Sequence, residues 1–385
     1  MITVNYGKDW VKASYDSLAA SDIQNYLKPM LASNPQMSVA IKPNMVVTRP
    51  PSDGATTHPE VVEGIIRYLL DVGISAKNMK IMESAAVGYS TKKAYKICGF
   101  EELEKRYGVI LTDLKNAQAV TKRNNEMGLD IHIAKEALDA DFFINVPVLK
   151  SHCQTRLTCC LKNLKGCISE SEMKRFHSLG LHRPIAALAA MLPVHYCVVD
   201  SICGDLTFEE GGTPLEANRI ITGRDPVMID SYCAGLIGFR PEEITHLLIA
   251  RDMGLGEFYS QDTKVVELNV DQKPLKQQKS LRLSDRYVDD IEEDKACSVC
   301  YASLIFALHR TGGRSSASGR STAGGRSTAS GRSSASNKND KICIGQGFKG
   351  KKTGTDQLGI GSCCKNFKNY VKGCPPKAVD IMAAL

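Results

Sequence analysis

The sequence has few aromatic residues, which make up 6% of its 385 residues and include a single tryptophan. It has no interleaved aromatic ladder on which bases could stack, which argues against a nucleic-acid partner. It also lacks an apolar run of 18 residues, and the segment that starts at Met1 has no basic region followed by an apolar one. We therefore expect a cytoplasmic protein that does not enter a membrane.

Nucleotide-binding motifs are missing as well. The sequence contains no P-loop, no G-x-G-x-x-G after a strand and no H-E-x-x-H, so it offers no motif for a nucleotide or a flavin. Its hydrophobic content of 43% and charged content of 24% are those of an ordinary globular protein. The net charge of +7 includes four arginines in one low-complexity stretch, and other lysines cluster near loops with Gly, Asn and His. This pattern favours a small anionic substrate.

Short β-branched runs alternate with amphipathic segments, which predicts an α/β fold with mostly parallel sheets and flanking helices. The predicted strands cover residues 38–42, 79–83, 109–112, 141–146 and 196–200. The predicted helices cover residues 58–72, 100–107, 184–191, 226–236 and 241–253.

The length of the chain suits two domains. Residues 265–294 are rich in Lys, Gln, Asp and Glu, as in an exposed linker, and we place the boundary near Ser284. The prediction is an α/β substrate-binding region at 1–284, of one or two lobes, and a small α/β cysteine-bearing domain at 285–385. A tandem Gly/Arg/Ser repeat at 311–337 cannot build a core, and we interpret it as a disordered insertion rather than an RNA-binding tract.

Four of the 14 cysteines have the context of metal ligands. Cys297 and Cys300 form a C-x-x-C pair, which alone could be a zinc half-site, a dithiol pair or half of an iron–sulfur site. Cys363 follows Gly361-Ser362, and Cys374 lies between Gly373 and two prolines. Proline after a ligating cysteine and glycine before it are typical of ferredoxin-type sites, so we predict a 4Fe-4S cluster. Cys364 stays open as an alternative third ligand, and Cys343 is a spare.

This cysteine pattern resembles the proximal-cluster site of nickel–iron hydrogenase small subunits, which combines C-x-x-C, a later G-x-C and G-C-P-P. The matching residues here are Cys297, Cys300, Cys363 and Cys374. Four cysteine ligands leave no iron open to a substrate, so electron transfer is the expected role of the cluster.

A first group of polar residues lies around the end of the predicted strand 38–42. Lys42 and Asn44 follow this strand, and Thr57 and His58 precede the next helix. Ligands of α/β sheets bind beyond the carboxyl ends of strands, and helix N-termini attract anions, so these side chains are candidates for binding a phosphate or carboxylate. Loop and cap hydrogen bonds are the alternative for Asn44 and Thr57.

A second polar group follows the apolar strand 141–146. Its members are basic or polar residues that are costly to bury without a ligand: Lys150, His152, Lys162, Asn163, Lys165 and, further on, His177. We predict that they bind the anionic substrate, with Lys150 and His152 as catalytic acid–base groups and His152 as the proton carrier near neutrality. Asp230 lies in an otherwise apolar helix, which suggests a buried partner.

The sequence is identified as a member of the family called domain of unknown function 362. The resemblance spans about residues 38–255. It rests on Lys42-Pro-Asn with Thr-Thr-His-Pro, Asn145-Val-Pro-Val-Leu-Lys with Leu-Lys-Asn-Leu-Lys-Gly, Val198-Val-Asp-Ser-Ile and Asp225-Pro-Val-Met-Ile-Asp. The cysteine region resembles the cluster-bearing extension of some members. A fainter likeness to the nickel-pincer lactate racemase fold implies a cleft between two α/β lobes and a small hydroxy-acid-like substrate, although that family's histidines are absent at matching places.

Three functional hypotheses follow from these residues. The first is an iron–sulfur oxidoreductase that exchanges electrons with a small anionic substrate or a bound cofactor. The second is a redox-neutral lyase or isomerase acting on a small carboxylate or phosphate, with a structural cluster. The third is an electron-carrier module for a partner protein. We leave open a ferredoxin-like electron partner and a homodimer.

Overall fold

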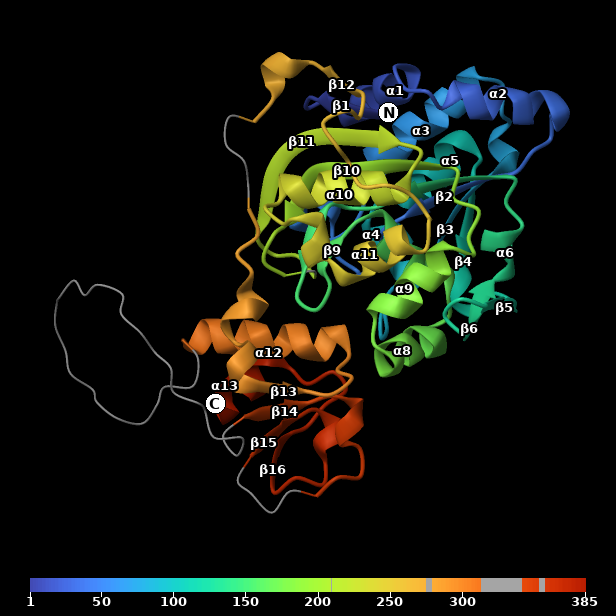
Figure 1. The fold of residues 1–385 in the computed structure, drawn as a ribbon. Helices are drawn as coiled ribbons and strands as arrows, with labels where there is room; N and C mark the ends of the chain where they lie inside the picture. Colours follow the sequence, from blue (N-terminus) through green and yellow to red (C-terminus); the bar gives the residue numbers. More distant parts are fainter. Residues whose placement is uncertain (209, 275–278, 313–340, 353–356) are drawn as a thin grey trace. The chain divides into compact units, whose positions relative to one another are not determined.

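The computed structural model describes residues 1–208, 210–274, 279–312, 341–352 and 357–385. These residues divide into two compact units, Met1–Leu281 and Arg282–Leu385 (Figure 1). The sequence places a boundary near Ser284. Most of the insertion predicted at 311–337 lies outside the described residues.

The first unit is built on an eight-stranded sheet. In spatial order its strands are β12 (Val265–Leu268), β1 (Ile2–Tyr6), β11 (Pro214–Gly223), β10 (Tyr196–Asp205), β7 (Phe142–Val146), β2 (Val39–Pro43), β3 (Met79–Glu83) and β4 (Ile110–Asp113). All neighbours are parallel except β11, which is antiparallel to both β1 and β10. The predicted α/β class with a mostly parallel sheet is therefore confirmed.

Helices cover both faces of this sheet. The helices of the first unit are α1 (Trp10–Ala19), α2 (Gln24–Ser33), α3 (Pro59–Asp71), α4 (Thr91–Ile97), α5 (Phe100–Tyr107), α6 (Lys135–Leu138), α7 (Cys160–Asn163), α8 (Glu170–Leu179), α9 (His182–Ala189), α10 (Pro226–Leu236) and α11 (Thr245–Asp252). Two antiparallel hairpins complete it, formed by β5 (Ala119–Asn124) with β6 (Leu129–Ala134) and by β8 (Lys150–His152) with β9 (Arg156–Thr158).

Alternate residues of the central strands supply two hydrophobic cores. In β2, Val39 and Ile41 pack with residues of α1 to α5, whereas Ala40 packs with residues of α6 to α11. In β10, Val198 and Val199 divide between the same two cores. Strands that are buried on both faces need near-continuous apolar runs, which explains why β2, β7 and β10 could be predicted from the sequence. No helix in the described ranges is long and apolar enough to cross a bilayer.

The second unit contains a four-stranded sheet and two helices. Its elements are β13 (Ile291–Glu293), α12 (Ser298–Thr311), β14 (Ile342–Ile344), β15 (Leu358–Ile360), β16 (Asn369–Val371) and α13 (Ala378–Ala384). The strands lie in sequence order and every pairing is parallel. A small core contains Cys343, Phe348, Cys364 and Phe367. The carboxyl ends of all four strands thus share one edge.

The close packing of α1 on α3 provides a test of the fold. A Cβ atom at Gly64 would lie 2.4 Å from Val11 O and 2.6 Å from Ser14 Cβ. Gly64→Ala should therefore lower the free energy of unfolding by about 1–3 kcal/mol, because the backbone of α1 must shift. Leu70→Ala, at a 36% exposed position of α3, should change it by less than about 1 kcal/mol. Urea denaturation measures both, and equal effects would contradict the packing argument.

Candidate functional site

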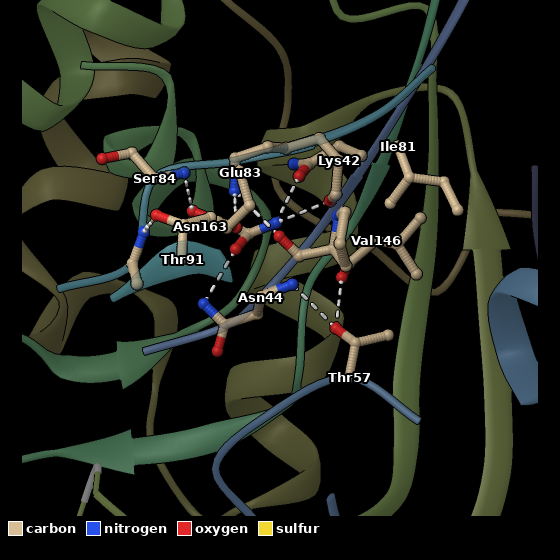
Figure 2. A network of polar contacts seen from close by, with 12 residues as sticks. Lys42, Asn44, Thr57, Ile81, Glu83, Ser84, Thr91, Val146 and Asn163 are labelled. Carbon is tan, nitrogen blue, oxygen red and sulfur yellow. Dashed lines mark hydrogen bonds and ion pairs between the residues drawn. The ribbon is translucent and has the colours of Figure 1, made fainter. Parts of the chain in front are cut away.

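A buried ion pair lies at the carboxyl end of β2 and β3 (Figure 2). The Lys42 ammonium contacts the Glu83 carboxylate, and the two side chains are 0% and 3% exposed. Lys42 Nζ also donates to Pro43 O at 2.8 Å, and Glu83 Oε1 accepts from Ser84 N at 2.9 Å. Burial raises the pKa of Glu83 and Lys42 lowers it, with a net value above the usual one. Lys42 therefore has an internal partner, which the sequence did not indicate.

Amide side chains extend this network toward α7. Asn44 Nδ2 donates to Asn163 Oδ1 at 2.8 Å, and Asn163 Nδ2 donates to Lys42 O at 3.1 Å and to Asn145 Oδ1 at 2.7 Å. Thr57 Oγ1 accepts from Asn44 N at 2.8 Å and donates to Val146 O at 2.9 Å. The structure therefore brings together Lys42, Asn44, Thr57 and Asn163 (Figure 2). Asn44 Oδ1 is buried without a hydrogen-bond partner in the structure.

Gly166 packs directly against the ion pair. A Cβ at this position would lie 1.8 Å from Glu83 Oε1 and 2.4 Å from Lys42 Nζ. Only glycine fits so close an approach. This contact joins the Leu-Lys-Asn-Leu-Lys-Gly motif to the end of β2.

The hairpin of β8 and β9 contributes to a cluster of basic groups. Lys150 pairs with Thr158 in this hairpin, and its Nζ donates to Ala55 O at 2.6 Å. Lys150 is fully buried, and Ser151 Oγ and Thr158 Oγ1 are buried with no hydrogen-bond partner among the described residues. Lys165 Nζ lies 3.3 Å from His177 Nε2. We name the residues Lys150, His152, Lys162, Lys165 and His177 the basic cluster.

His152 is the electrostatic centre of the basic cluster. Burial lowers its pKa well below the usual value, and Lys162, Lys165, Lys150 and His177 lower it further. Its Nδ1 accepts from Gln154 N at 3.1 Å and Thr155 N at 3.2 Å. The imidazole is therefore neutral at pH 7 without a ligand. The sequence predicts instead a proton carrier that titrates near neutrality. An anion bound among the lysines would raise the pKa again.

Asp230 anchors the first turn of α7. Its Oδ1 accepts from Cys160 N at 2.6 Å, and its Oδ2 accepts from Leu161 N at 3.0 Å. Two backbone N–H groups are thus among the partners of this buried carboxylate. Cys159, Cys160 and Asp230 also have donor atoms within 4.8 Å of one another, and are a possible metal-binding group among the described residues.

His58 and its neighbours form a separate contact. The backbone N–H of His58, which precedes α3, donates to Asp200 Oδ2 at 2.7 Å, and the His58 side chain is buried. The imidazole also lies 2.8 Å from this carboxylate oxygen. Asp200 is a partner that sequence reasoning did not assign to His58.

The four predicted cluster ligands lie beyond the strands of the second unit. Cys297 follows β13 and precedes α12, with Cys300 one turn later, while Cys363 and Cys374 follow β15 and β16. Ser362 N donates to Gly373 O at 2.8 Å, which ties the last two loops together. Gln346 Nε2, beyond β14, lies 3.7 Å from Cys297 Sγ.

The four predicted ligands are more exposed than the other two cysteines of the second unit. Cys297, Cys300 and Cys363 are partly exposed and Cys374 is exposed, whereas Cys343 and Cys364 are buried in the small core. Burial raises the pKa of Cys363, Lys349 lowers it and Cys374 raises it, so Cys374 is an electrostatic neighbour of Cys363.

The fold and these polar groups define an α/β protein with a buried polar network at the carboxyl ends of parallel strands. A family model described as domain of unknown function (DUF362) matches residues 39–235, just over half of the chain. The chain therefore belongs to this family, as the sequence motifs predict.

Similar proteins include a thylakoid-associated protein of Synechocystis, which is 23% identical over 228 residues and matches 56% of this chain and 68% of that protein. The lactate racemase apoprotein from Thermoanaerobacterium thermosaccharolyticum matches at 14% identity and a TM-score of 0.40, covering 61% of this chain and 57% of that one. A Thermotoga maritima protein matches at 14% identity and a TM-score of 0.30, covering 50% and 51%. The chain thus spans little more than half the length of these solved structures.

The Lys42–Glu83 pair predicts a strong energetic coupling. Lys42→Met or Glu83→Gln should each lower the free energy of unfolding by about 3–5 kcal/mol, because each leaves a buried polar partner uncompensated. The double variant should lose clearly less than the sum. Urea denaturation of the four proteins measures the coupling. Lys12→Met, which breaks an exposed pair with Asp16, should change the free energy of unfolding far less, and additive losses at Lys42 and Glu83 would contradict the pairing.

Proposed function

We propose that this protein is an iron–sulfur oxidoreductase. A 4Fe-4S cluster bound by Cys297, Cys300, Cys363 and Cys374 would exchange electrons with a small anionic substrate or a bound cofactor at the basic cluster. The observation that carries this proposal is the arrangement of the second unit, where the four cysteines lie beyond the carboxyl ends of parallel strands.

The residues beside the four cysteines support a cluster over a single metal ion. In a four-iron cluster each thiolate binds a different iron, and inorganic sulfides lie between the irons. Gly361 and Gly373, at φ of 84° and 136°, precede Cys363 and Cys374. Because glycine has no Cβ, a bound sulfide could approach the backbone there without a steric clash.

The same geometry favours Cys363 over Cys364 as the third ligand. Cys363 is partly exposed, whereas Cys364 is fully buried and its Sγ donates to Cys343 O at 3.6 Å. Cys364 therefore serves the small core, and Cys363 is available to a cluster.

A fully cysteine-bound cluster supplies one-electron transfer and no open iron. Substrate binding would therefore fall to residues of the first unit. The basic cluster offers several positive charges, which suit an anionic substrate. Among the described residues, the buried hydroxyls of Ser151 and Thr158 have no hydrogen-bond partner, and burying a hydroxyl is costly unless a ligand satisfies it.

Acid–base work at this site would begin with a neutral His152. Because Nδ1 accepts two backbone N–H groups, Nε2 carries the proton and can donate it to a bound anion. Lys150 would hold the anion as a fixed charge. We further propose a cytoplasmic location and a ferredoxin-like electron partner, and a homodimer is compatible with this function.

Anaerobic reconstitution tests the cluster. The full chain should bind about four irons and show the broad visible absorption of a 4Fe-4S centre. Cys363→Ser should lose most of the iron, whereas Cys364→Ala should keep it and lose only stability. Stoichiometric zinc without iron, or the reverse behaviour of the two variants, would contradict the proposed ligand set. A cluster that dithionite cannot reduce while the enzyme turns over would favour the redox-neutral lyase or isomerase.

Calorimetric titration with inorganic phosphate tests the basic cluster. Lys162→Met or Lys165→Met should weaken binding about 10- to 100-fold, the loss expected for one charged hydrogen bond. Lys174→Met is the matched control, because this half-exposed lysine pairs with Glu170 on α8. An equal loss in the control, or no binding by the unsubstituted protein, would contradict an anion site at these lysines.

A further inference from the structure

A thiol, an imidazole and a carboxylate lie in hydrogen-bonding order at the start of α3. His58 Nδ1 is 2.8 Å from Asp200 Oδ2, and His58 Nε2 is 3.6 Å from Cys203 Sγ. The side chains are shielded from solvent, with residue exposures of 4% for His58, 0% for Asp200 and 5% for Cys203. None of the lysines of the basic cluster takes part in these contacts.

The aspartate fixes the orientation of the imidazole. Asp200 Oδ2 also accepts from His58 N at 2.7 Å, and Oδ1 accepts from Ile202 N at 3.0 Å, so the carboxylate is held by the backbone on both sides. The ring of Trp10 lies edge-on to His58 with 5.0 Å between the centroids. With Nδ1–H donated to Asp200, Nε2 is directed at the thiol. This is the arrangement of nucleophile, base and orienting group that activates a cysteine.

An irregularity in β10 brings both Asp200 and Cys203 to the imidazole of His58. Residues three apart in a regular strand point to opposite faces, yet Asp200 and Cys203 of β10 both contact His58. The register between β10 and β11 shifts between Ser201 and Cys203, and Asn218 on β11 has a φ of 46°. Bulges of this kind redirect side chains and are frequent beside active sites.

The contacts of His58 favour a proton on its imidazole. Burial lowers the pKa of His58, but Asp200 and then Cys203 raise it to about 10. Pro51 O and Ser52 O, at 3.7 and 4.0 Å from Sγ, accept from the thiol when it is protonated.

We propose that Cys203 is the nucleophile of a Cys203–His58–Asp200 triad that accepts the acyl group of a small ester or thioester. The thiol proton passes to His58 Nε2 as an electron pair of Sγ forms the bond to the acyl carbon, and the bond from that carbon to the leaving group breaks. The leaving group departs with its electron pair and, where it is basic, takes the proton held by His58. The product is a thioester on Cys203, and no oxidant or reductant is consumed.

The probe for this reaction is p-nitrophenyl acetate, added to the full chain under anaerobic conditions. A burst of about one nitrophenolate per chain is expected, with the acetyl group on Cys203 by peptide mass spectrometry. His58→Ala should slow acetylation of Cys203 about 10²- to 10⁴-fold, the range for loss of a general acid–base group. Added imidazole should restore part of this rate, which a purely structural role of His58 would not allow.

Cys98→Ser is the matched control. Cys98 is as buried as Cys203, and its Sγ contacts Arg49 O at 3.3 Å and Thr56 Oγ1 at 3.7 Å but no imidazole. This variant should keep the burst, and Cys203→Ser should lose it. A burst that survives in Cys203→Ser, an acetyl group found on other residues alone, or a His58→Ala variant that labels Cys203 at the normal rate would overturn the proposal.

Discussion

The buried ion pair of Lys42 and Glu83 is the constraint on which the polar end of the large sheet depends. It joins the carboxyl ends of β2 and β3, and Gly166 packs on it at a distance that excludes any side chain. The peptide oxygen of Lys42 accepts a hydrogen bond from Asn163 Nδ2, and this bond fixes α7 and the lysines beside it. Each of these buried charges is stable only beside the other, because no water solvates it. The segments that surround the pair therefore have little freedom to move.

The fold class could be predicted because burial on both faces leaves a signature in the sequence. The strand predicted at 79–83 matches β3, the one predicted at 38–42 is shifted by one residue from β2, and the one predicted at 141–146 begins one residue before β7. β1, β11 and β12 were not predicted. β12 lies at the sheet edge and the first three residues of β11 are exposed, which weakens the apolar pattern that a strand in the middle of the sheet must have.

The candidate site was predictable in part for a different reason. Carboxyl ends of parallel strands meet at one edge, so Lys42, Asn44 and Asn163 could be expected near one another without knowledge of distances. The partners of these side chains could not be predicted. Glu83 lies 41 residues from Lys42, and Asp200 lies 142 residues from His58; a single sequence carries no record of such pairings. For Thr57, the hydrogen bonds to Asn44 and Val146 agree with the loop alternative.

The anchoring of α7 by Asp230 links the site to the folding of the chain. The carboxylate that holds the start of this short helix comes from α10, 70 residues further along. A helix of four residues cannot persist alone, so the segment that carries Lys162 and Asn163 depends on α10 for its shape. Elements that depend on each other in this way open together. Amide protons of α7 and α10 should therefore exchange as one cooperative unit, and the polar network will exist only while that unit is closed.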